Sequence, residues 1–197
     1  MKKRAFLGAT LAAGALPALA ARPAAQPAGP TLLTISGALT RPNRGAFDPA
    51  LDQMMAKHKL GFTRAHALDF ASLLRLKAQT IRPTLEYDGK AHSLRGPLLV
   101  DVLELAGAAL DSETRLALRA VDGYAAAITA GEARARRFIV ATHLDGQPMA
   151  LGGLGPLWAV YDADRVPHMA ALPLRQRFGS CPWALYHIEV QAWSGQA

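Results

Sequence analysis

The sequence predicts an α+β fold, with a mixed β-sheet and short flanking helices around one core. Of the 197 residues, 51% are hydrophobic and 19% charged, a composition typical of a folded domain and not of a disordered segment. Short alternating segments suited to strands are mixed with short amphipathic segments suited to helices. The two kinds do not alternate one by one, which argues against a doubly wound parallel sheet.

The first twenty residues are predicted to be a signal peptide and not part of the fold. Lys2, Lys3 and Arg4 form a charged start, an apolar run extends to Leu16, and residues 18–20 have the small side chains of a cleavage site. The Lys3-Arg4 pair also approaches the twin-arginine pattern, so general secretion and twin-arginine export both remain open. We therefore expect a periplasmic or secreted protein without a membrane span after cleavage.

Residues 21–30 are rich in proline and alanine and are predicted to form a flexible linker, so that a single domain covers residues 31–197. The formal net charge of +7 falls by three, to +4, without the cations of the signal peptide. No basic stripe with interleaved aromatic residues remains, so we expect no nucleic-acid partner. A single cysteine excludes an intrachain disulfide, and the six histidines lack paired ligand spacing, so we expect no metal site.

The domain is predicted to begin with a strand and a helix. Residues 31–37 alternate apolar and polar side chains and end at a glycine, which is typical of a strand followed by a turn. Asp48, followed by proline, has the pattern of a helix start. This helix is expected to turn Leu51, Met54 and Met55 toward the core.

A second short helix and a hairpin are predicted next. Asp69 is expected to cap a helix that extends through Leu76. Residues 80–87 alternate as a strand does, and Pro83 places that strand at a sheet edge. An aspartate–glycine turn then leads to a returning strand at residues 91–94.

The second half is predicted to start with a helix and to continue mainly as strands. Gly96 and the following proline are expected to open a helix through Leu105, which Gly107 ends. A hairpin over residues 116–128 and a short helix over residues 130–136 then follow. Further strands are expected at residues 138–144, 157–161 and 183–193, and a loop-rich segment at residues 162–180 precedes the last of them.

Five segments carry a resemblance to a known family. They combine glycine-rich turns with apolar strands or helices, and they cover residues 95–107, 122–128, 138–149, 152–161 and 183–190. In order and spacing they resemble the oxidoreductase molybdopterin-binding domain family, to which sulfite oxidases and periplasmic molybdoenzyme subunits belong. The resemblance extends over roughly residues 31–191 and implies a sulfite-oxidase-like molybdopterin-binding fold.

The resemblance also implies a molybdopterin cofactor, whose soft metal is held by a protein thiolate shortly before the helix at Gly96. Residues 74–94 contain no cysteine. We therefore expect that molybdopterin is not bound, with a non-cysteine ligand to the metal as the alternative. Cys181 lies far along the chain and is interpreted as a small buried residue, with a ligand role as the minor alternative.

Five residues are candidates for binding a ligand or cofactor, and no catalytic residue is assigned. By resemblance, Tyr124 faces the substrate pocket, whereas an ordinary strand tyrosine would have a half-buried ring. Four arginines suit an anion, or are ordinary surface residues. Two lie in or next to the cysteine-free segment, Arg82 and Arg95, and two lie in the late loop, Arg175 and Arg177.

Three functions remain open. We expect an exported protein of oxidoreductase ancestry that lacks the cysteine ligand and binds a small anionic or polar ligand, as a periplasmic module or the partner of a sensor or redox protein. The alternative is a molybdopterin-dependent oxidoreductase with a non-cysteine metal ligand. The third is an interaction or assembly protein with an incidental pocket. Molybdenum analysis would distinguish the first two.

Overall fold

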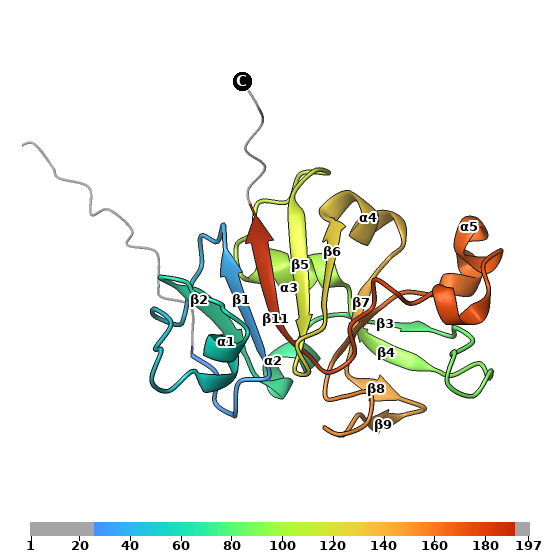
Figure 1. The fold of residues 1–197 in the computed structure, drawn as a ribbon, viewed down its shortest axis with the longest axis horizontal. Coiled ribbons are helices and arrows are strands. Elements are labelled where there is room, and N and C mark those ends of the chain that lie inside the picture. The colour runs from blue at the N-terminus through green and yellow to red at the C-terminus, as the bar shows by residue number, and fades with distance from the viewer. Residues whose placement is uncertain (1–25, 192–197) are drawn as a thin grey trace, which may run out of the picture.

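The computed structural model describes residues 26–191 and has an α+β fold with a mixed sheet and short helices, as predicted (Figure 1). The predicted signal peptide and the first part of the predicted linker lie outside the described residues. Within residues 26–191, the helices are all too short or too polar to cross a membrane.

The largest layer is a five-stranded sheet with strand order β2-β1-β11-β5-β6. Its strands are β1 (Leu33–Gly37), β2 (Ala65–Leu68), β5 (Arg115–Ala120), β6 (Ala125–Thr129) and β11 (Leu185–Gln191). The β1 and β11 strands are parallel, and the other neighbours are antiparallel. The last strand therefore lies in the middle of the sheet, between the first strand and the β5–β6 hairpin.

Two smaller sheets lie to one side of this layer, at the lower right of Figure 1. One has the order β3-β4-β8-β9, and the other pairs β10 with β7. Their bounds are β3 (Ala78–Ile81), β4 (Leu94–Pro97), β7 (Ile139–Ala141), β8 (His143–Leu144), β9 (Gln147–Pro148) and β10 (Trp158–Val160).

Short helices connect and cover the sheets. They are α1 (Gln53–Lys57), α2 (Phe70–Leu74), α3 (Leu99–Leu105), α4 (Ala130–Ala135) and α5 (Pro167–Ala170), with 3-10 turns η1 (Ala163–Arg165) and η2 (Leu174–Gln176). The α3 helix lies behind the five-stranded sheet in Figure 1, and α5 projects at the far right. Thr129 caps α4 in a capping box with Glu132, which satisfies backbone donors at the helix start.

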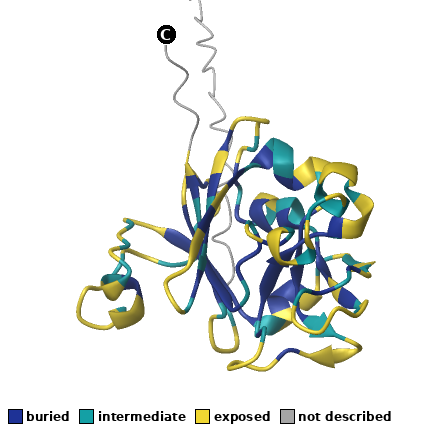
Figure 2. Cartoon of the chain, turned by 45° about the vertical axis from the view of Figure 1, so that its right-hand side comes forward, coloured by how far each residue is buried: buried dark blue, intermediate teal, exposed yellow. Residues whose placement is uncertain are grey.

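The core follows from side-chain alternation in the strands. Leu33, Ile35, Leu116 and Leu118 are fully buried and occupy alternate positions, so they lie on one face of their strands. The other face of β5 is partly exposed, whereas β1 also buries Thr34 and Ser36. Figure 2 shows this buried layer at the centre of the molecule, with exposed residues concentrated in the loops and on the outer helix surfaces. Because the chain has no disulfide, its stability depends on the burial of these apolar side chains.

The predicted helix at Asp48 is wrong in its start and in two of its buried residues. The Asp48 carboxylate accepts hydrogen bonds from the backbone N–H groups of Ala50 and Leu51, which forms a turn, and the helix begins only at Gln53. Met55 is buried as predicted, but Leu51 and Met54 are 82% and 41% exposed. A local side-chain turn therefore replaced the expected first helical turn.

The predicted helix start at Gly96 is also wrong, since Gly96 and Pro97 belong to strand β4 and the helix begins at Leu99. A Cβ atom on Gly96 would lie 1.9 Å from the carbonyl oxygen of Val140, so only glycine allows this approach to β7. Gly107 has a φ of +78° and follows the helix end, as predicted.

The predicted hairpin at residues 80–94 is confirmed in its turn but not in its length. Strand β3 covers Ala78–Ile81 and β4 begins at Leu94, so most of the expected strand residues form a long loop between them. A single bridge joins Thr84 to Ala91 within that loop, and Gly89 has a φ of +69°. Asp69 caps α2 through the N–H of Ser72, as predicted.

Candidate functional site

A cavity of about 250 Å³ opens where three loops meet beside the five-stranded sheet. The loops are the one between β3 and β4, the turn between β5 and β6, and the segment before β11. The lining residues combine aromatic, charged and small side chains, and they are Glu86, Tyr87, Ala120, Asp122, Tyr124, Arg175, Phe178, Gly179, Cys181, Pro182 and Trp183. We call this the loop cavity.

The β5–β6 turn presents Tyr124 to the loop cavity. The Asp122 carboxylate accepts a hydrogen bond of 2.9 Å from the Tyr124 N–H, and Gly123 has a φ of +93°, so this turn depends on both residues. The Tyr124 hydroxyl donates to the carbonyl oxygen of Gly179. One tyrosine therefore connects the turn to the segment before β11 and closes one side of the cavity.

A buried aromatic ring lies next to the cavity. Trp158 is fully buried, and its ring centroid lies 6.4 Å from that of Tyr87 and 6.2 Å from that of Phe178. The indole N–H of Trp158 donates to the carbonyl oxygen of Cys181 at 2.9 Å. The two cavity residues Tyr87 and Phe178 therefore both lie next to one fully buried ring.

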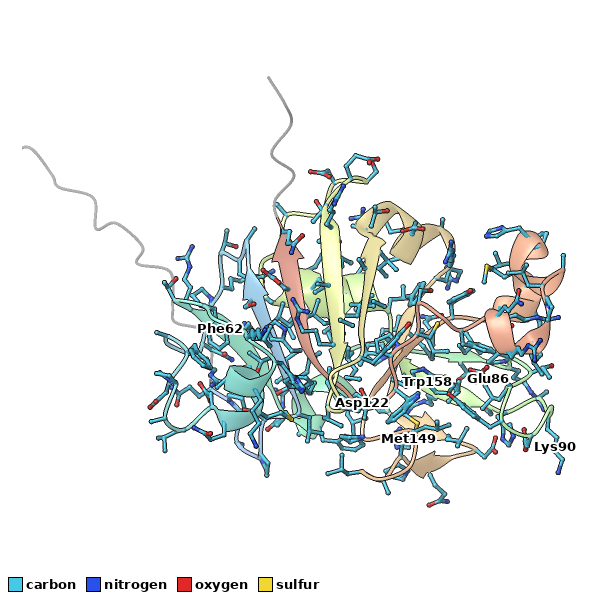
Figure 3. All side chains as sticks on the ribbon, viewed as in Figure 1. Phe62, Glu86, Lys90, Asp122, Met149 and Trp158 are labelled. Carbon is cyan, nitrogen blue, oxygen red and sulfur yellow. The ribbon has the colours of Figure 1, made fainter. Side chains whose placement is uncertain are left out.

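Both signs of charge line the loop cavity. Glu86 and Asp122 contribute carboxylates and Arg175 a guanidinium. In Figure 3, Asp122 and Glu86 lie on either side of Trp158. Burial and the nearby Glu86 carboxylate raise the pKa of Tyr87, so its hydroxyl stays protonated and can donate a hydrogen bond near neutral pH.

Cys181 is 4% exposed, and burial raises the pKa of its thiol to about 12. The thiol is therefore protonated at neutral pH, and it behaves as a small buried residue, the main interpretation from the sequence. A nucleophilic or metal-binding role requires a thiolate, which this environment disfavours.

We expect native Cys181 to react with iodoacetamide, near pH 8, at least about 100-fold more slowly than the unfolded chain does. The reasons are the loss of thiolate, since the ordinary pKa is 9.0 and the folded one about 12, and the lack of access. Mass spectrometry of the alkylated protein with and without urea gives both rates, and Cys181 is the single cysteine. Equal rates would contradict a buried, protonated thiol.

The structure brings two of the five predicted site residues together. Tyr124 and Arg175 line the loop cavity, whereas Arg82, Arg95 and Arg177 do not. Arg82 and Arg95 are exposed beside the smaller sheet. The Arg177 side chain instead donates hydrogen bonds to residues around α5. Its acceptors are the Asp164 carboxylate, at 2.7 Å, and the carbonyl oxygens of Ala170 and Leu172, so its role is structural.

Sequence reasoning missed Glu86, Tyr87, Asp122 and Trp183 as cavity residues. Glu86 and Tyr87 lie in the cysteine-free segment, residues 74–94, and immediately precede its aspartate–glycine turn. Residues next to a predicted turn between strands often carry function, since loops hold binding groups on a rigid scaffold. That signal was present, but it did not single out these side chains.

The loop cavity does not fit a phosphate-bearing pterin with a thiolate-held metal. Its volume of about 250 Å³ lies below the roughly 300–1,000 Å³ typical of pockets for such ligands. Two carboxylates oppose one guanidinium, which disfavours a phosphate group. The cysteine is buried and protonated. Among residues 26–191 no group of three or more His, Cys, Asp or Glu side chains is placed to hold a metal ion.

Comparison with known proteins shows a similar fold among solved structures. No protein-family model matches the chain, and no curated protein matches it in sequence. Among solved structures, the fold is similar to the crystal structure of the sulfane dehydrogenase SoxCD from Paracoccus pantotrophus, with a TM-score of 0.51 and 11% sequence identity. The match covers 81% of this chain and 37% of that one, so this chain spans little more than a third of its length.

Proposed function

We propose that this chain is an exported ligand-binding module of oxidoreductase ancestry, and that the loop cavity binds a small zwitterionic molecule. The ancestry is supported by the fold, which is similar to that of a dehydrogenase, and by the sequence resemblance to sulfite-oxidase-like proteins. Export is supported by the charged start, apolar run and cleavage pattern of residues 1–20. A periplasmic sensor or redox protein is the proposed partner.

The convergence of both signs of charge on an aromatic-walled cavity carries the proposal. An ammonium group is attracted to carboxylates and to aromatic ring faces, and Glu86, Asp122 and Trp183 provide these. A carboxylate on the same ligand is matched by the Arg175 guanidinium and by the protonated Tyr87 hydroxyl. The sequence predicted an anionic or polar ligand, and the lining residues favour a ligand with both charges.

The test is calorimetric titration of the purified protein with the free L-amino acids, which all carry an ammonium and a carboxylate. We expect at least one to bind with a saturable heat. Glu86→Gln and Arg175→Ala should each weaken that binding about 10- to 100-fold, because each removes one charge-assisted hydrogen bond of about 1.5–3 kcal/mol.

Matched controls are available outside the cavity. Glu113→Gln and Arg115→Ala change exposed residues of the same types, and both variants should bind as the wild type does. If no amino acid binds, or if the cavity variants bind unchanged, the proposed ligand class is wrong.

The alternative function, a molybdopterin-dependent oxidoreductase with a non-cysteine metal ligand, has its own measurement. Protein exported by its native host would be analysed for molybdenum and for pterin fluorescence. The resemblance and the fold are compatible with both functions, so the metal content has to decide between them. One molybdenum per chain would favour the enzyme over the binding module.

A further inference from the structure

A second cavity lies at the far end of α4 and shares no lining residue with the loop cavity. Its volume is about 280 Å³, and three arginines line it together with one carboxylate and three apolar side chains. The residues are Ile81, Ala135, Arg136, Arg137, Asp162, Arg165 and Val166. We call this the arginine cavity.

The three arginines differ in how far they are already engaged. Arg136 contacts Glu132 at 3.4 Å, and its guanidinium carbon lies 5.5 Å from the Tyr161 ring centroid. The Arg137 side chain donates one hydrogen bond of 3.3 Å, to the side chain of Gln79. The Arg165 side chain makes no hydrogen bond or ion pair within residues 26–191. The cavity therefore holds donors that the protein itself does not fully use.

The neighbouring carboxylates do not neutralise this charge. Asp164 accepts from Arg177 at 2.7 Å and from the Thr84 N–H at 2.7 Å, so it is already paired. Asp162 is the one carboxylate that lines the cavity. Glu132 pairs with Arg136, which leaves the guanidinium groups of Arg137 and Arg165 against the one lining carboxylate, and this excess of positive charge attracts an oxyanion. Arginine is well suited to bind such an anion with two parallel hydrogen bonds.

Asp162 adds a requirement for a proton on that anion. Its Oδ2 accepts a hydrogen bond of 3.2 Å from the Arg82 N–H, whereas its Oδ1 is buried and has no partner among the described residues. A buried carboxylate oxygen without a donor is costly, and a donor on a bound ligand would satisfy it. Hydrogen phosphate has both parts, namely oxygens for the arginines and a hydroxyl for Asp162.

We propose that the arginine cavity binds hydrogen phosphate, with Arg137 and Arg165 holding its oxygens and Asp162 Oδ1 accepting its proton. This site is independent of the proposed ligand of the loop cavity. Sulfate is the discriminating comparison, because it has the same shape but no proton near neutral pH, and it would face the Asp162 carboxylate without a hydrogen bond. Phosphate monoesters are largely unprotonated at that pH, since their second pKa is about 6, and should bind less well than inorganic phosphate.

The test is calorimetric titration of the full chain with sodium phosphate, sodium sulfate and phenyl phosphate, near neutral pH and at low ionic strength. We expect phosphate to bind at least about tenfold more tightly than sulfate or phenyl phosphate. Arg165→Ala and Arg137→Ala should each weaken phosphate binding about tenfold or more, by loss of a charge-assisted hydrogen bond. Arg165→Ala removes a side chain without partners, so the variant should fold normally.

Two further variants make the test specific. Asp162→Asn keeps an oxygen for the Arg82 N–H but offers an amide donor, so it should lower the preference for phosphate over sulfate. Arg134→Ala is the matched control, because Arg134 lies in the last turn of α4, shortly before Arg136 and Arg137, but does not line the cavity, and the variant should bind phosphate unchanged.

The proposal is overturned if the wild type does not bind phosphate at millimolar concentration, or if Arg165→Ala binds it unchanged. Equal binding of sulfate and phosphate would overturn the role of Asp162. Tighter binding of phenyl phosphate would instead indicate an ester whose apolar part contacts Ile81 and Val166, and it would overturn the assignment of free phosphate. Arg175→Ala, a loop-cavity variant, should leave phosphate binding unchanged, which separates this result from the proposed function.

Discussion

Trp158→Ala is expected to lower the free energy of unfolding by about 3–5 kcal/mol, the range for removing a fully buried aromatic side chain. Trp158 is fully buried between Tyr87 and Phe178, and its N–H satisfies the carbonyl oxygen of Cys181. The substitution would leave a cavity and an unpaired buried carbonyl group. For a chain of this length, the loss corresponds to a fall in Tm of roughly 10 °C.

Urea denaturation followed by circular dichroism measures this loss. Trp183→Ala is the matched control, because Trp183 is only partly buried at the rim of the loop cavity and should cost less than half as much. Trp158→Phe keeps a ring but loses the hydrogen bond, so its loss should fall between the two. Equal losses for Trp158→Ala and Trp183→Ala would show that Trp158 is not the base of the aromatic cluster.

The second large effect is an acid-dependent loss of stability from His187. This residue is 1% exposed, its Nε2 lies 3.0 Å from the Ser36 hydroxyl, and its Nδ1 has no hydrogen-bond partner among the described residues. Burial, with the nearby charges of Arg119 and Arg44, lowers the pKa of His187 from 6.5 to about 4. The native state therefore resists protonation of this ring.

The direction of the effect follows from which state binds the proton. Between about pH 6.5 and pH 4 the unfolded chain protonates His187 and the native state does not, so stability is complete above about pH 6.5 and falls on acidification. The full loss is about 3 kcal/mol, at 1.36 kcal/mol per unit of pKa. Burial also lowers the pKa of His66, which adds a loss of the same sign.

Urea denaturation at about pH 7 and about pH 4.5 tests this effect. His187→Gln cannot titrate, and we expect it to remove most of the pH dependence in this window, whatever its stability at neutral pH. His168→Gln is the control, because His168 is exposed on α5 and should leave the pH dependence unchanged. The lowered pKa values of Asp52 and Asp145 act at lower pH. Hydrogen bonds to Asp145 and Asp88 raise the pKa of His92, so protonation of His92 on acidification stabilises the native state and partly offsets the loss in both proteins alike. The same pH dependence in the wild type and in His187→Gln would contradict a buried neutral His187.

Local patterns in the sequence were sufficient wherever one short segment decides its own structure. The strand ending at Gly37, the α2 cap at Asp69 and the stop at Gly107 were all predicted, because each depends on side chains and dihedral angles within a few residues. The β5–β6 hairpin was predicted for the same reason, since its turn residues Asp122 and Gly123 act locally. The mixed order of these segments was enough to predict the α+β class.

Only the tertiary structure decided where distant segments meet. Gly96 was expected to open a helix, yet it lies in strand β4 through its pairing with β3, and the nearby Val140 carbonyl oxygen leaves no room for a Cβ atom there. The loop cavity combines Glu86, Asp122 and Arg175, and the arginine cavity combines Arg137 and Arg165, from elements far apart in the chain. Sequence patterns report contacts within about one turn or one strand, whereas these sites depend on long-range packing of the whole core.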